Sequence, residues 1–198
     1  MARPREFDRD EALDKALDLF WSKGYEKTSI QDLVDHTGVH RGSIYDTFGD
    51  KNQLFLTCLE RFHGVHKDRA FQVLNTPGEP QDILERFFEE LIDRAMDNDN
   101  QRRGCFITNT AMELGATDPE ISARIASYLQ AMEDFFLGFL QRCQPSGVLN
   151  DSLSVEEMAR FLLNTRQGLY VLGKTATDRK MLEDVSKVAI HAILKPKK

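Results

Sequence analysis

The sequence predicts an all-α protein in which an N-terminal unit of three helices is joined to a larger helical unit. Apolar residues recur at the spacing of one helix face along most of the 198 residues, whereas the alternation typical of a half-buried strand is not sustained. Glycine and proline fall between these periodic segments, where helices end or begin. A chain of this length can bury enough surface to fold without a disulfide or a metal.

The first two helices are indicated by apolar stripes and by end signals. Residues 8–23 carry alanine, leucine and phenylalanine at helical spacing, and Gly24 follows as a stop. Thr28 or Ser29 starts the second helix, and the pattern Thr28-x-x-Gln31 fits a capping box.

A short third helix is expected over residues 41–48, and Asp50 can cap a long fourth helix that follows it. We place the boundary between the two units at this point, which gives residues 1–50 and 51–198. The two units are then joined by a rigid helix and not by a flexible linker.

The second unit predicts five more helices. Asp118-Pro119 supplies a cap and a proline at the first helical position, and Ser154-x-x-Glu157 is a further capping box. The helices are expected over residues 83–95, 105–114, 119–143, 154–173 and 178–194, with polar loops at 77–80, 98–104 and 145–151.

The composition excludes several classes of protein. Hydrophobic residues make up 41% and charged residues 29%, as in soluble globular proteins, and no apolar stretch approaches the roughly 18 residues of a membrane span. The N-terminus turns acidic where a signal peptide needs an apolar run, so we expect a cytoplasmic protein without a membrane partner. The three cysteines include no close pair, which argues against a disulfide framework or a zinc cluster.

Motifs for catalysis or for a cofactor are not found, so we expect no enzyme and no bound metal. No serine pairs with a suitable histidine and aspartate, and no glycine-rich phosphate loop is present. His63-x-x-His66 places two imidazoles on one helix face, but no third ligand is near them in the sequence.

The net charge of −6 argues against general affinity for nucleic acid. Residues 1–50 contain seven lysines and arginines against eleven aspartates and glutamates, so the first unit is acidic too. Any DNA binding must then depend on a few well-placed cations. The candidates are Arg3, Arg5, Arg41 and Lys51.

Residues 28–51 carry the most informative pattern. Two short helices separated by about three residues around Gly38 have the spacing of a helix-turn-helix. Ile44 and Phe48 can pack on the preceding helix, which leaves Arg41 and Tyr45 on the opposite face. An arginine there can contact a guanine edge or a phosphate. The alternative is a helical hairpin whose polar face meets only water.

The segment around this pattern, from Ala12 to Leu56, resembles the N-terminal domain of the TetR (tetracycline-repressor-like) family of bacterial transcriptional regulators. The resemblance implies a three-helix DNA-binding domain and a larger helical domain for ligand binding and dimerisation. It also implies a homodimer that represses from a palindromic operator and leaves it when a small-molecule effector binds. The matching residues are Ala16, Phe20, Gly24, Tyr25, Thr28, Ser29, Ile30, Ile44, Tyr45, Phe48, Lys51 and Leu54.

The resemblance also assigns roles by position. The base-facing start of the recognition helix is His40, Arg41, Gly42 and Ser43, and the phosphate contacts are Thr28, Tyr45, Thr47 and Lys51, with Ser29 completing the DNA-binding set. Asp46 departs from the aromatic residue or histidine of many relatives. An acid cannot contact a phosphate, so this side chain either accepts from a cytosine amino group or faces water.

The last two predicted helices offer a dimer interface. The last helix carries an apolar seam, and the helix before it offers Met158, Leu162, Leu169 and Tyr170, with Gly168 permitting close approach. The alternative is that a terminal amphipathic helix covers only its own core. The seam consists of Met181, Leu182, Val185, Val188, Ala189, Ala192 and Ile193.

An apolar ligand pocket in the second unit is harder to place, because each candidate could equally be part of the core. The candidates are Phe87, Met112, Phe135, Phe139 and Tyr170, with Phe88, Phe136 and Phe161 as further aromatic residues of the same kind.

Cys105 is a candidate redox sensor. It follows Arg102 and Arg103 and opens a helix, and both features stabilise the reactive thiolate. The string Gly104-Cys105-Phe106 is similar to a stretch in some TetR-type regulators that respond to electrophiles or oxidants. An inert buried cysteine is the alternative. For the whole chain, a helical sensor of small molecules or oxidants with weak or no DNA binding remains the second hypothesis.

Overall fold

The computed structural model describes residues 7–97 and 102–196, and these residues form the predicted all-α fold. Arg3 and Arg5 lie outside the described residues, as do positions 98–101 of the predicted polar loop. The helices are α1 (Arg9–Lys23), α2 (Ile30–Thr37), α3 (Arg41–Phe48), α4 (Lys51–Leu74), α5 (Pro80–Ala95), α6 (Phe106–Leu114), α7 (Pro119–Cys143), the short 3-10 helix η1 (Gln144–Ser146), α8 (Val155–Gly173) and α9 (Arg179–Ile193).

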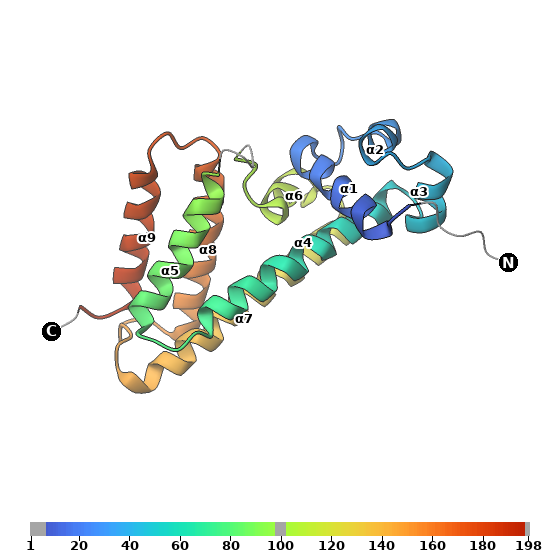
Figure 1. Cartoon of the computed structure of the whole chain (residues 1–198). Coiled ribbons are helices and arrows are strands. Elements are labelled where there is room, and N and C mark those ends of the chain that lie inside the picture. Colours follow the sequence, from blue (N-terminus) through green and yellow to red (C-terminus); the bar gives the residue numbers. More distant parts are fainter. Residues whose placement is uncertain (1–6, 98–101, 197–198) are drawn as a thin grey trace.

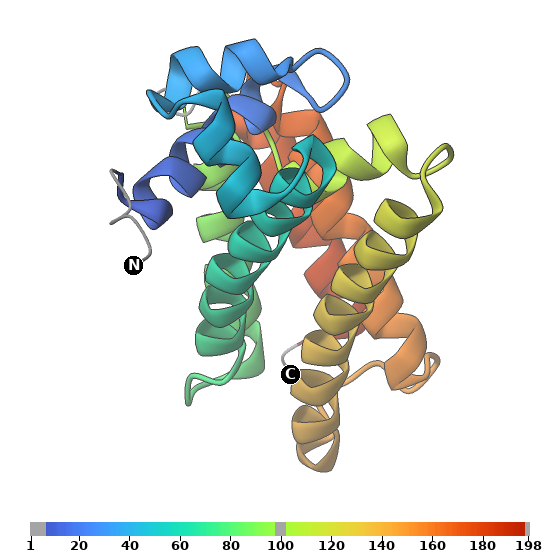
Figure 2. The ribbon, with the colours of Figure 1, turned by 90° about the vertical axis from the view of Figure 1, so that its right-hand side faces the viewer.

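The molecule has two ends that α4 and α7 connect (Figure 1). Helices α1, α2 and α3 gather at one end, which we call the head, and α5, α8 and α9 stand together at the other end, which we call the body. Figure 2 looks onto the head and shows α4 and α7 running away from it next to each other, and the two helices are in contact. Figure 1 places α6 between the head and the body.

The core of the head forms where α1 crosses the first turns of α4. The rings of Phe20 and Phe55 meet edge to face with centroids 5.0 Å apart, and Phe20 is 1% exposed. Phe106 of α6 continues this aromatic cluster, with its ring 5.5 Å from Phe55 and 5.7 Å from Phe62. The core of the head therefore runs into the core of the body without a break.

The capping box at the start of α2 lies one residue later than the box predicted between Thr28 and Gln31. Ser29 is the N-cap, and its hydroxyl and the Asp32 carboxylate form the reciprocal capping box. The predicted box between Thr28 and Gln31 is wrong, because the Thr28 side chain is buried and its hydroxyl donates to the carbonyl of Gly24 at 2.5 Å.

The predicted seam on α9 divides between two faces of the helix. Leu182, Ala189 and Ile193 are buried in the core of their own chain, whereas Val185 and Val188 are exposed. The expectation of one continuous apolar seam is therefore corrected: about half of it covers the core, and the rest forms a narrower exposed stripe that also contains Met181. The interface residues predicted on α8 are also corrected, because Met158, Leu162, Leu169 and Tyr170 are buried in the core of their own chain.

No helix in residues 7–97 and 102–196 is both long enough and apolar enough to cross a bilayer.

Candidate nucleic-acid interface and its link to the body

The turn between α2 and α3 has the geometry of a helix-turn-helix. Gly38 has a φ of 73°, in the left-handed region that glycine adopts without strain, and its N–H donates to the Val34 carbonyl at 2.9 Å. Leu33 from α2 and Ile44 and Phe48 from α3 are buried. The predicted packing of α3 through Ile44 and Phe48 is confirmed, and the opposite face of α3 is left at the surface.

That opposite face presents the residues that the sequence placed against DNA. Arg41 lies over the ring of Tyr45, with the guanidinium carbon 5.6 Å from the ring centroid, and its Nη2 donates to the Tyr45 hydroxyl at 3.4 Å. An added Cβ at Gly42 would meet no atom of the chain within 4 Å, so the backbone there is open to close approach. The exposed residues of this face are His40, Arg41, Gly42, Tyr45 and Asp46, and Ser43 and Thr47 are half-buried.

Two predicted phosphate contacts have structural partners inside the head instead. Thr28 is 0% exposed, so its hydroxyl cannot reach a phosphate in this conformation. The Lys51 ammonium donates to the carbonyls of Tyr25 and Thr28, both at 3.0 Å, and lies 4.1 Å from the centre of the Tyr25 ring. Lys51 therefore holds the segment before α2 against the start of α4, a role that sequence spacing did not reveal.

Ser29 also has local partners. Its hydroxyl donates to the Asp32 carboxylate at 2.6 Å and accepts from the Asp32 N–H at 3.1 Å. The hydrogen bond from Lys23, together with those from Ser29, holds the pKa of Asp32 far below its usual range. The start of α2 thus keeps a neutralising cation beside its carboxylate, which limits the repulsion of a nearby phosphate.

Arg9 is a cation beside α3 that was not predicted from the sequence. The Arg9 guanidinium lies over the Phe48 ring at 5.3 Å and so adds positive charge near the end of α3. The exposed acids Asp35, Asp46 and Asp50 lie in the same part of the head. The charge of this surface is therefore mixed, as the sequence predicted.

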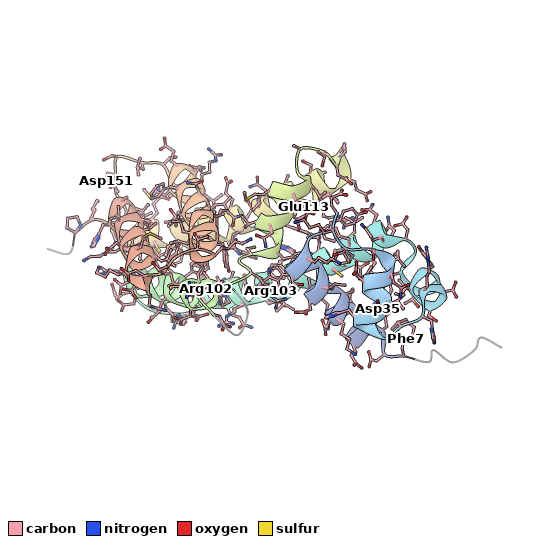
Figure 3. All side chains as sticks on the ribbon, turned by 90° about the horizontal axis from the view of Figure 1, so that it is seen from above. Phe7, Asp35, Arg102, Arg103, Glu113 and Asp151 are labelled. Carbon is pink, nitrogen blue, oxygen red and sulfur yellow. The ribbon has the colours of Figure 1, made fainter. Side chains whose placement is uncertain are left out.

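Helix α6 connects this head to the body through polar contacts (Figure 3). The Glu113 carboxylate accepts from the backbone N–H of Tyr25 at 3.2 Å and of Glu26 at 2.9 Å, in the loop that leads into α2. Arg103, which precedes α6, lies 4.5 Å over the Trp21 ring of α1. These contacts join residues more than 80 positions apart, and for that reason sequence spacing gave no sign of them.

The candidate pocket residues do not share one cavity, which corrects that expectation. Phe87 and Tyr170 line a small cavity between α4, α5 and α8, whereas Phe139 lines a separate groove beside the loop between α4 and α5. Phe135 is half-buried and packs on Phe71 at 5.6 Å. Met112 is 76% exposed and lines neither space.

Cys105 is the N-cap residue of α6 and is 2% exposed. The two preceding arginines have other partners: Arg102 donates to the carbonyl of Ala176, and Arg103 donates to Asp18. Because both arginines bind other groups, they stabilise a Cys105 thiolate less than expected. The burial of Cys105 also restricts the access of a reagent.

The two histidines of α4 have aromatic partners. The His63 ring stacks on Tyr128 at 4.1 Å, and the His66 ring packs against Phe62 at 4.1 Å. Within residues 7–97 and 102–196, the structure contains no group of three histidine, cysteine or carboxylate side chains that could hold a metal ion.

Comparisons with known proteins agree with this architecture over its whole length. Residues 12–58 match a family model described as bacterial regulatory proteins of the tetR family, and residues 80–189 match a tetracyclin repressor-like C-terminal domain. An uncharacterised HTH-type transcriptional regulator of Bacillus subtilis, YezE, is 31% identical over 98% of this chain and 100% of its own. The HTH-type transcriptional repressor ComR of Escherichia coli is 31% identical over 94% of this chain and 88% of its own.

A solved structure is also similar over nearly the whole chain. It is a cysteine mutant of the regulator CifR complexed with 26-base-pair operator DNA, with a TM-score of 0.85 and 28% identity over 97% of this chain and 100% of that one.

The Glu113 contact predicts a local change when its carboxylate is removed. In Glu113→Ala, we expect amide hydrogen exchange at Tyr25 and Glu26 to accelerate about tenfold, because a hydrogen bond to a charged group contributes on the order of 1.5 kcal/mol. Met112→Ala is the matched control, since that neighbouring side chain is 76% exposed. Equal exchange rates in the two variants would contradict a clamp at Glu113.

Proposed function

This chain belongs to the TetR family of bacterial regulatory proteins, and from that membership we propose that it is a homodimeric, sequence-specific DNA-binding repressor whose release is triggered by a signal in the body. The observation that carries the proposal is the exposed face of α3, with Arg41 supported on Tyr45 and with an open backbone at Gly42. In this proposal residues 1–50 bind DNA, and residues 51–198 dimerise and receive the signal.

In the DNA complex, α3 lies in the major groove. His40, Arg41, Gly42 and Ser43 at its start face base edges, and Arg41 supplies a bidentate contact to guanine. Tyr45 and Thr47, and Ser29 from the start of α2, lie toward phosphates, where hydroxyl groups position a protein without reading sequence. Thr28 and Lys51 act indirectly, because they fix the segment that carries α2.

The dimer forms through α8 and α9. These two helices pack on each other, and each carries apolar side chains that the chain itself does not cover. Burying the two stripes against a second copy gives a four-helix bundle and removes them from water. A dimer reads two half-sites about one helical turn apart, so its operator is a palindrome. The exposed residues are Phe161, Val171 and Leu172 of α8 and Met181, Val185 and Val188 of α9.

The signal reaches the head through α4 and α6. Helix α4 packs against both the head and the body, and Glu113 of α6 holds the loop before α2. A small molecule that separates the body helices, or a modification at Cys105 where α6 begins, therefore changes the placement of α3. The two α3 helices of a dimer then no longer fit successive grooves.

A helical sensor with weak or no DNA binding is the second candidate, and the acidic charge of residues 1–50 favours it. Selection of bound fragments from random duplex DNA separates the two functions. Enrichment of a palindrome supports the repressor, and no enrichment by folded, dimeric protein supports the sensor.

Arg41→Ala is expected to weaken binding to the selected operator by about 1–3 kcal/mol and to relax the preference at one base pair, because a bidentate base contact is lost. Dissociation constants at fixed salt measure the effect. Arg86→Ala, an exposed arginine of α5, removes the same charge from the body and serves as the control. Unchanged affinity of Arg41→Ala would mean that α3 does not read the groove as proposed.

Val188→Asp is expected to convert the dimer to a monomer, because it places a charge in the centre of the proposed interface. The mass in solution, measured by light scattering at micromolar concentration, checks this. Val65→Asp on α4 makes the same substitution at a side chain of equal exposure, 65% for both residues, and should leave the dimer intact. A wild-type protein that is monomeric at this concentration would refute the proposed assembly.

Cys105→Ser is expected to abolish release from the operator by N-ethylmaleimide, while wild-type protein is released. Burial raises the pKa of the Cys58 and Cys143 thiols and keeps them protonated, so Cys143→Ser should respond like the wild type. A gel shift with the selected operator reads out both variants. Release of Cys105→Ser at the wild-type rate would remove this cysteine from the signal.

A further inference from the structure

A small cavity in the body is lined by more positive than negative side chains. It lies between α4, α5 and α8 and has a volume of about 10 Å³, the room of about one water molecule. Three guanidinium groups and one carboxylate line it, an excess of two positive charges. The charged residues are Arg69 of α4, Arg94 and Glu90 of α5, and Arg166 of α8.

Arg94 is the unusual member of this group. Its Nε and Nη1 atoms are buried, and neither has a hydrogen-bond partner in the described part of the chain. The nearest carboxylate oxygen, Glu90 Oε2, lies 3.6 Å from Nη1 and already accepts from Arg69 Nε at 3.0 Å. Guanidinium stays charged in proteins, and leaving its buried donors unsatisfied destabilises the folded chain. An acceptor from outside the chain would satisfy them.

Arg69 pairs with Glu90, whereas the partners of Arg166 and His66 in the described part of the chain are not carboxylates. Arg166 is 7% exposed; its Nη1 donates to the neutral Gln167 amide oxygen at 2.6 Å, and its guanidinium lies 4.9 Å from the centre of the Tyr170 ring. Burial, reinforced by Arg94, Arg166 and Arg69, lowers the pKa of His66 to about 4, so this imidazole is neutral at pH 7.

We propose that this cavity binds a small organic carboxylate with an apolar body. The two carboxylate oxygens accept from Arg94 and Arg166, because planar guanidinium groups match carboxylates in shape and in charge. The rings of Phe87 and Tyr170 line the same cavity and contact the apolar body. An inorganic anion would leave these rings without a partner.

The size of the cavity links binding to regulation. A ligand larger than water enters only if the surrounding helices separate, and the Arg69–Glu90 ion pair, on the more exposed side of the cavity, joins α4 to α5. Separation of α4 from α5 moves the helix on which the head is built. The carboxylate is then the effector. This effector role rests on the proposed function, whereas the binding of the carboxylate to the cavity does not.

Calorimetry of the full chain without DNA tests the site itself. Benzoate and hexanoate are titrated at constant ionic strength, with benzamide and hexanamide as neutral partners of the same shape. We expect at least one carboxylate to bind at least tenfold more tightly than its amide. We expect Arg94→Gln to weaken that binding at least tenfold and Arg86→Gln, exposed on the same helix, to leave it unchanged.

Equal affinity for acids and amides, no binding of either acid, or carboxylate binding that survives Arg94→Gln would overturn the proposal. Arg166→Gln repeats the test from α8 if Arg94→Gln does not fold. Arg94→Met gives a readout without ligand: Tm should rise by about 2–4 °C, since two buried donor atoms without an acceptor are removed. A fall in Tm would make Arg94 a structural residue and overturn its assignment.

A gel shift with the selected operator then separates the two proposals. Release by the carboxylate that binds, but not by its amide, supports the effector role. Binding of the carboxylate without release overturns the effector role and leaves the anion site in place. A chain that binds the carboxylate and no DNA overturns the proposed repressor function only.

Discussion

The burial of α4 at both of its ends is the constraint on which the rest of the structure depends. Near its start, Leu54, Phe55 and Cys58 are covered by the head, and near its end Ala70 and Leu74 are covered by the body. Because one rigid helix supplies part of both cores, neither unit can change its packing against α4 without changing the position of the other. The aromatic contacts of Phe106 with α4 and the Glu113 clamp on the head reinforce this coupling.

The head shows how an acidic domain can still present a DNA-binding face. The acids near α2 are engaged within the chain: Asp32 pairs with Lys23 at 2.7 Å, and Asp35 accepts from Gln31 at 2.8 Å. The start of α3 offers an arginine, a glycine and hydroxyl groups. An acidic surface around such a face lowers non-specific attraction to the phosphate backbone and leaves more of the binding energy to base contacts.

The core of the body is apolar, but the body departs from the usual distribution of side chains at two places: an apolar stripe is exposed on α8 and α9, and the Arg166 side chain is buried beside the small cavity. Apolar side chains at the surface of α8 and α9 gain stability only when a second chain covers them. The buried Arg166 guanidinium and the buried donors of Arg94 are stabilised, in our proposal, when an anion reaches them. Both departures fall on the elements that a ligand-responsive dimer requires, and neither lies in the core of the head.

The sequence alone determined the helices and their order, because apolar periodicity, N-cap residues and terminal glycines are local signals. Asp8, Asp50, Asp118 and Ser154 each begin a helix as predicted. The sequence also identified α3 and the residues on its exposed face. Ile44 and Phe48 mark the buried side of this short helix, so the residues on the opposite side must be exposed. It did not distinguish which apolar residues of α9 face the core of their own chain, because both faces of that helix are apolar. Only the tertiary structure decided that Thr28 is buried, that Lys51 holds Tyr25, that Glu113 reaches the head and that two buried donors of Arg94 have no acceptor among the residues that the structure describes. Each of these depends on segments that are distant in the chain and meet only when the helices pack.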